Sequence, residues 1–171
     1  MILLSGYFFN ETLAGIYALA STIGLIIFIG IQPINKALFP ITASDSVKEK
    51  PNKNNFFKAL GIILILSLLA LIVIGFFPEF LINIFAGKSL PEAHSIMLIL
   101  SVGMTLLSVT SFLLYYKLSQ GKTSNYQYIA LFLVVECILL IVFSQTLLSF
   151  ALAFLVSNVI FLIGSFFVLN K

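Results

Sequence analysis

The stretch ALGIILILSLLALIVIGFF, residues 59–77, decides the fold class of this chain. It carries no charged residue. A helix needs about 20 apolar residues to cross the roughly 30 Å hydrocarbon layer of a bilayer, and this stretch is close to that length. Its apolar residues run on without the alternation of polar and apolar positions that marks a membrane-spanning strand. The stretch therefore predicts a transmembrane helix.

The composition of the whole chain agrees with this prediction. Hydrophobic residues make up 61% of the 171 residues, charged residues only 9%, and the mean hydropathy is +1.18. A soluble domain has about 25% charged residues, so a water-soluble monomer is excluded, and so is a disordered chain. The single cysteine rules out a disulfide framework. We expect an all-α integral membrane protein.

Five membrane spans are predicted from the other apolar stretches. Residues 137–170 contain no charge, which is too long for one crossing, and the polar cluster Ser144-Gln145-Thr146 divides them. Phe39-Pro40 is expected to break the first span because proline removes a helical hydrogen bond. The predicted spans are approximately 13–39, 57–78, 94–117, 126–143 and 147–169, with a cytoplasmic loop at 40–56.

The nine lysines predict the orientation of these spans. Eight of them fall in alternate connectors and at the C-terminus, whereas Lys88 alone falls on the opposite side. By the positive-inside rule the lysine-rich connectors and the C-terminus are cytoplasmic, in a multi-pass protein of the cytoplasmic membrane. The formal charge of +3 is small and scattered, so no nucleic-acid partner is expected.

Glu136 and Asn158 are polar residues deep within predicted spans. A charge at such a depth costs on the order of 2.5–3.5 kcal/mol on insertion scales, so these residues usually face the bundle interior or a wet cavity. Glu136 has two interpretations: a structural hydrogen-bonded pair with Asn158 on the next helix, or a proton, cation or head-group site used in transport.

Gln32, Asn35 and Lys36 form a second polar group, around Pro33 at the end of the first span. They are typical either of a helix end with a snorkelling lysine or of a kinked segment that lines a cavity. Residues Ala14, Ala18 and Thr22, and likewise Ala20 and Gly24, recur every four positions and predict close helix packing.

Soluble-enzyme chemistry is not expected. The sequence has no glycine-rich nucleotide loop, no nucleophile elbow and no His/Cys/carboxylate cluster. We therefore predict a protein that is not an enzyme and that needs neither cofactor nor metal.

Several motifs resemble polysaccharide flippases of the multidrug/oligosaccharidyl-lipid/polysaccharide exporter superfamily. GYFFNETLAGIYALA (6–20) is similar to that family's helix entry, and the run from Gln32-Pro33 to Phe39-Pro40 is similar to its passage into a cytoplasmic loop. PEFLINIFAGKSLPEA (78–93) resembles its amphipathic outer segment, and LSQGK (118–122) its cytoplasmic turn.

The resemblance implies a fold and a function. Residues 1–171 would be most of the C-terminal lobe of a transporter with 12–14 helices, of the fold shared with the MATE-type drug exporters. The lobe would flip a lipid-linked oligosaccharide, a polyprenyl-diphosphate glycan, by alternating access, together with an N-terminal lobe and membrane lipids. From their own polarity, rather than from the resemblance, we expect five residues to line or support its cavity: Gln32, Asn35, Lys36, Glu136 and Asn158, with Lys36 meeting the diphosphate.

Two alternatives remain open. A cation-coupled drug exporter of the same fold would use Glu136 as its coupling carboxylate. A small structural membrane subunit would have no transport activity.

Overall fold

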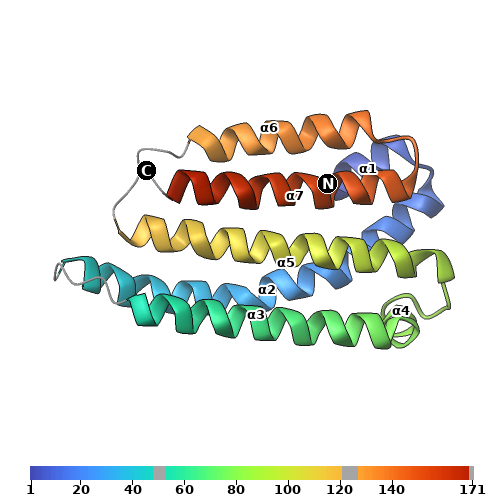
Figure 1. Cartoon of the computed structure of the whole chain (residues 1–171). Coiled ribbons are helices and arrows are strands. Elements are labelled where there is room, and N and C mark those ends of the chain that lie inside the picture. Colours follow the sequence, from blue (N-terminus) through green and yellow to red (C-terminus); the bar gives the residue numbers. More distant parts are fainter. Residues whose placement is uncertain (48–52, 121–126, 170–171) are drawn as a thin grey trace.

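The computed structural model is a bundle of helices whose long axes run side by side (Figure 1). It describes residues 1–47, 53–120 and 127–169. The regular structure of these residues is entirely helical, as the sequence predicted. The helices are α1 (Ile2–Phe8), α2 (Glu11–Val47), α3 (Lys53–Phe76), α4 (Pro78–Ala86), α5 (Pro91–Ser119), α6 (Gln127–Val142) and α7 (Leu147–Leu169).

Four of the helices in the described ranges are long and apolar enough to cross a membrane. The qualifying segments are Glu11–Thr42, Asn54–Phe76, Pro91–Ser119 and Leu147–Phe166. Helix α6 has 16 residues, or about 24 Å of helix, which is less than the hydrocarbon thickness. The chain is thus a multi-pass membrane protein by the length and composition of its helices, and a fifth span through α6 stays a prediction.

The connection between α2 and α3 differs from the expected loop at 40–56. Helix α2 continues through both Pro33 and Pro40 to Val47, and α3 begins at Lys53, so the expected break at Phe39-Pro40 is wrong. A tertiary contact holds this part of the helix: the Oγ1 of Thr42 lies 2.6 Å from the Oγ of Ser119 on α5, in a buried hydroxyl–hydroxyl hydrogen bond. A helix can continue through a proline where neighbouring groups compensate for the backbone hydrogen bond that the proline cannot make.

The predicted division of the last apolar stretch is confirmed. Helix α6 ends at Val142 and α7 begins at Leu147. The Ser149 hydroxyl donates to the carbonyl of Phe143 at 2.9 Å, and the Ser149 N–H donates to the Thr146 Oγ1 at 3.1 Å. These side chains bind backbone groups that a helix end leaves without partners.

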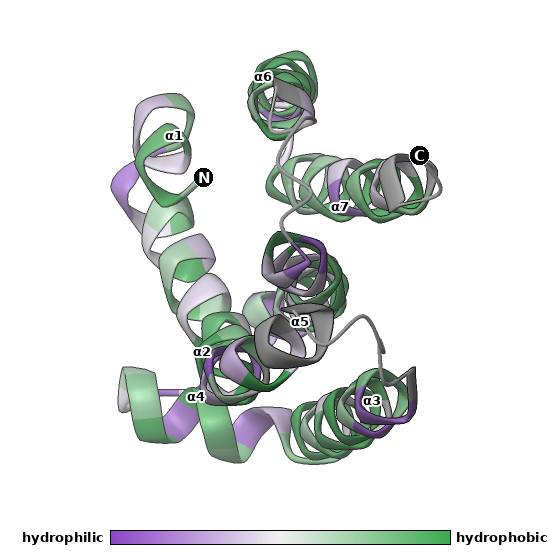
Figure 2. Cartoon of the chain, turned by 90° about the vertical axis from the view of Figure 1, so that its left-hand side faces the viewer, coloured by the Kyte–Doolittle hydropathy of each residue, from purple (hydrophilic) through white to green (hydrophobic). Residues whose placement is uncertain are grey.

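Helix α5 lies in the middle of the bundle, between α2, α3 and α7 (Figure 2). It runs parallel to α2 in a constant register. The backbone of Gly24 meets that of Ser101, and 18 residues further on Thr42 meets Ser119. These two points are about 27 Å apart along the helices, so α2 and α5 stay in contact over most of a membrane thickness.

Glycines stand at the contacts between the central helices. A Cβ on Gly24 would lie 3.3 Å from the backbone nitrogen of Ser101. A Cβ on Gly103 of α5 would lie 2.8 Å from the ring of Phe154 on α7, and one on Gly164 of α7 would overlap the ring of Phe132 on α6. Small residues allow membrane helices to approach closely. The predicted Ala20–Gly24 packing line is therefore confirmed, whereas Thr22 on the other line is exposed.

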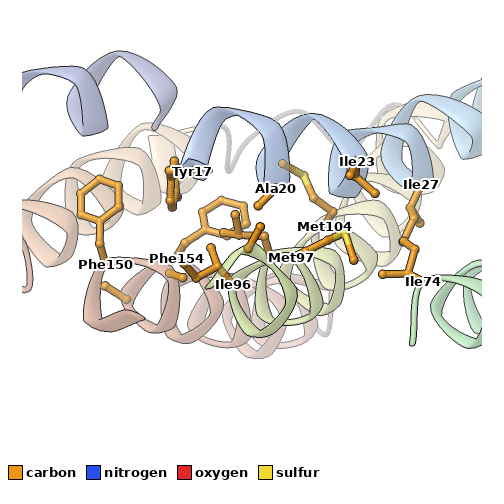
Figure 3. Close-up of a cluster of buried hydrophobic side chains, with 14 of the residues drawn as sticks. Tyr17, Ala20, Ile23, Ile27, Ile74, Ile96, Met97, Met104, Phe150 and Phe154 are labelled. Atoms are coloured by element: carbon orange, nitrogen blue, oxygen red, sulfur yellow. The ribbon is translucent and has the colours of Figure 1, made fainter. Parts of the chain in front are cut away.

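The core between these helices is apolar. Figure 3 shows side chains of α2 facing side chains of α5, with two phenylalanines of α7 beside them. The residues are Tyr17, Ala20, Ile23 and Ile27 of α2, Ile96, Met97 and Met104 of α5, and Phe150 and Phe154 of α7. Helix α3 is much less enclosed, because its leucines and isoleucines are largely exposed. An exposed aliphatic surface of this kind suits a hydrocarbon solvent.

Helix α4 lies across the axis of the bundle rather than along it. It is seen end-on in Figure 1 and from the side in Figure 2. Proline begins it and Gly87, with φ 66°, ends it in the left-handed conformation that favours glycine. Ile82, on one face of α4, is buried, whereas Phe80 and Ile84 of the same helix are exposed.

We predict that Gly24→Leu destabilises the protein. The added side chain has no room against the backbone of α5, so the helices must separate, and the free energy of unfolding should fall by about 1–3 kcal/mol. The measurement is reversible unfolding in detergent micelles. Gly61→Leu is the matched control, because a Cβ on Gly61 meets no heavy atom within 4 Å; equal losses in the two variants would contradict the role of Gly24.

Candidate functional site

The polar residues on the second half of α2 differ in their exposure. Lys36 is exposed, Gln32 is half-buried, and Asn35 is 1% exposed. By the α2–α5 register Asn35 is level with Phe112, a fully buried residue whose ring stacks on that of Phe56 of α3 at 5.3 Å. Asn35 is thus buried inside the bundle at the level of Phe112, while Lys36 is exposed.

The side-chain amide of Asn35 is without a hydrogen-bond partner among the described residues. Both its Oδ1 and its Nδ2 are buried. An unsatisfied buried polar group costs about 1–3 kcal/mol, and such groups usually have a water, ion or ligand partner. Asn35 therefore offers a donor and an acceptor inside the bundle, one position from an exposed lysine.

Glu136 is half-buried on α6 and lies within electrostatic range of two groups near the start of the chain. It interacts electrostatically with Tyr17 of α2 and with the amino group of Met1. Tyr17 is fully buried, its hydroxyl donates to the Sδ of Met1 at 3.3 Å, and its ring packs on Phe150 at 5.1 Å. Sequence reasoning did not select Tyr17, although Tyr17 lies in the GYFFNETLAGIYALA motif and is its only tyrosine within a membrane-length helix.

The predicted hydrogen bond between Glu136 and Asn158 is wrong. The two residues do lie at similar depth, because Phe132, one turn before Glu136, packs on Phe161, one turn after Asn158, at a ring distance of 4.7 Å. Asn158 is buried, however, and its Nδ2 donates to the carbonyl of Phe154 at 2.8 Å. Depth could be counted from the sequence, but the direction in which each side chain leaves its helix could not.

The structure divides the predicted cavity residues into separate groups. Tyr17, which interacts with Glu136, and Asn35 are 18 residues apart on α2, about 27 Å of helix. Gln32, Asn35 and Lys36 therefore form one group and Glu136 with Tyr17 another, while Asn158 lies on the face of α7 that carries Phe154.

The hydroxyls of α5 bind mainly their own helix. Thr105, Ser108 and Thr110 each donate to the carbonyl four residues earlier, at 3.0, 2.8 and 2.9 Å. Such bonds satisfy the hydroxyls without a cavity. As for metals, no group of three or more His, Cys, Asp and Glu side chains occurs within residues 1–47, 53–120 and 127–169.

We predict that a double-mutant cycle will separate the neighbours of Glu136. Glu136→Gln and Tyr17→Phe should be coupled by at least about 0.5 kcal/mol in unfolding free energy, because the two residues share Met1 as a neighbour: the Tyr17 hydroxyl bonds its sulfur, and its amino group acts on Glu136. Glu136→Gln and Asn158→Ala should be additive within the same margin, since Asn158 bonds its own helix. Coupling with Asn158 but not with Tyr17 would reverse the assignment.

Comparison of the chain with known proteins identified no similar protein. No protein-family model matches the chain, and no curated protein or solved structure matches it significantly. The residues and their arrangement establish a general class, an all-helical chain with several membrane-length helices.

Proposed function

We propose that this chain is the C-terminal part of a membrane transporter that flips lipid-linked oligosaccharides across the cytoplasmic membrane by alternating access. The observation that carries the proposal is the unpartnered Asn35 amide beside exposed Lys36. Lys36 offers a positive charge to an anionic head group at the surface of the bundle, and Asn35 offers a free donor and acceptor one position away in its interior. The motifs at 6–20, 32–40, 78–93 and 118–122 favour the flippase family and its MATE-like fold.

The order of elements supports this proposal. A helix that lies across the bundle, α4, follows the second long helix at the position of the family's amphipathic outer segment. In the proposed transporter, α1 to α7 form most of one lobe, and an N-terminal lobe supplies the other wall of the cavity. The substrate would be a polyprenyl-diphosphate glycan, and the protein would carry out no covalent chemistry on it.

The proposed orientation places the C-terminus in the cytoplasm. Figure 1 shows that α2 and α3 meet at the end of the bundle where α5 ends, α6 begins and α7 ends. Lys36 and Lys58 belong to the halves of α2 and α3 nearest this end, whereas Lys88 follows α4 at the other. The positive-inside rule assigns the lysine-rich end to the cytoplasm.

We predict that an impermeant maleimide will distinguish the two ends in intact cells. In a Cys137→Ser background, Lys88→Cys should be labelled from outside, and Lys58→Cys should be labelled only after permeabilisation. Both lysines are exposed, so accessibility within the protein is matched. Labelling of Lys58→Cys in intact cells would invert the proposed topology.

We predict that Lys36→Ala and Asn35→Leu impair export of the surface polysaccharide by the full-length transporter. Loss of a hydrogen bond to a charged group costs about 1.5–3 kcal/mol, so the export rate should fall about tenfold or more at equal protein level. Lys58→Ala is the control, because Lys58 is an exposed lysine near the same end of the bundle but on α3. Normal export by Lys36→Ala and Asn35→Leu would remove these residues from the substrate site.

A second candidate function rests on Glu136. A half-buried carboxylate within an apolar helix, within electrostatic range of Tyr17, suits the coupling site of a cation-driven drug exporter. Glu136→Gln in the same strain distinguishes the two functions. Loss of proton-coupled drug efflux with unchanged polysaccharide export would favour the exporter.

A further inference from the structure

A groove lies between α2 and α3, with part of its lining from α4. Its volume is about 330 Å³. Its walls are aliphatic side chains and one glycine, with no polar side chain among the residues that line it: Ile23, Ile26, Ile27, Gly30 and Ile31 of α2, Leu66, Ala70, Val73 and Ile74 of α3, and Leu81 of α4.

The groove is continuous with the exposed aliphatic surface of α2 and α3. Ile26, Leu66 and Val73 line it and are each 44–50% exposed. They belong to helices that are long and apolar enough to span a membrane. Water is absent at this depth, so hydrocarbon is what fills a hollow open to this surface; left empty, its lining would lose dispersion contacts.

Gly30 makes the groove deeper. Glycine within a helix costs about 1 kcal/mol relative to alanine, and at Gly24 the close approach of α5 accounts for it. A Cβ on Gly30, in contrast, would meet no heavy atom within 4 Å. No neighbouring helix requires a glycine at this position, and its effect on the structure is to leave one wall of the groove without a side chain.

The dimensions of the groove match one leaflet of a bilayer. Its lining covers residues 23–31 of α2 and 66–74 of α3, about 12 Å of helix in each case, and half of the roughly 30 Å hydrocarbon layer is about 15 Å. The α3 wall ends two residues before the end of that helix, and Leu81 of the transverse helix α4 completes the lining there. The groove therefore lies in the half of the membrane on the α4 side.

We propose that this groove binds one acyl chain of a phospholipid from the leaflet on the α4 side, with the lipid head group beside α4. The bound chain completes the packing between α2 and α3, where no interhelical glycine contact forms. This site is separate from the polar residues of the proposed transport function, and it stands or fails independently of them.

The test is photolabelling of the protein in phosphatidylcholine nanodiscs. The probe is a phosphatidylcholine that carries a diazirine halfway along one acyl chain, and adducts are mapped by mass spectrometry of peptides. Adducts should concentrate on residues 23–31 and 66–74 rather than on the opposite, exposed face of α3 formed by Ile65, Leu68 and Ile72.

Two variants fill the groove from opposite walls. Gly30→Leu and Ala70→Leu should each lower groove labelling about tenfold, which corresponds to about 1.4 kcal/mol of binding free energy. Gly61→Leu, whose side chain enters open space outside the groove, should leave labelling unchanged. Circular dichroism of each variant checks that the helices remain folded.

Two outcomes would overturn the proposal. One is equal adduct density on the groove and on the opposite face of α3, or labelling that neither filling variant lowers. The other is displacement of the acyl-chain probe by an equal mole fraction of polyprenyl phosphate, which would make the groove a site for a polyprenyl tail instead of an ordinary membrane lipid.

Discussion

Close approach of helices at glycine is the constraint on which the rest of this structure depends. Within a bilayer the lipid chains are as apolar as leucine, so helices associate through packing and hydrogen bonds rather than through the hydrophobic effect. Gly24 brings the backbone of α2 against α5, Gly103 receives the ring of Phe154 from α7, and Gly164 receives the ring of Phe132 from α6. Helices α5 and α7 each take part in two of these contacts, and α5 is the centre of the bundle because it also packs against α3.

Helix α3 packs differently because its glycines make no such contact. A Cβ on Gly61 would meet nothing, and one on Gly75 would only touch a leucine side chain at 3.8 Å. Helix α3 instead packs through larger residues, among them the ring of Phe56 against Phe112 and Tyr116. Larger residues keep the axes farther apart, and the aliphatic groove beside α2 occupies the space that remains.

The polar groups inside the bundle divide according to how their hydrogen bonds are satisfied. Short hydroxyl side chains on α5 bond to carbonyls of their own helix, and Asn158 does the same on α7. Thr42 and Ser119 bond each other and fix the register of α2 and α5. Asn35 has neither kind of partner within the part of the chain that the structure describes, and the same is true of the buried hydroxyls of Ser67 and Ser101. Asn35 differs from these two serines in lying one position from an exposed lysine, and Glu136 differs from all of them in carrying an ionisable group.

The all-helical class, the break at Ser144–Thr146 and the segregation of lysines follow from the sequence alone, because each depends on local transfer free energies that add along the chain. The Ala20–Gly24 line could also be recognised from its spacing. The passage of α2 through Pro40, the partner of Asn158 and the proximity of Tyr17 to Glu136 depended on the tertiary structure. These features depend on how far each helix is rotated and shifted relative to its neighbours. These helices are apolar on nearly every side, so their hydropathy pattern does not show which face packs inward, and the rotation cannot be derived from the sequence.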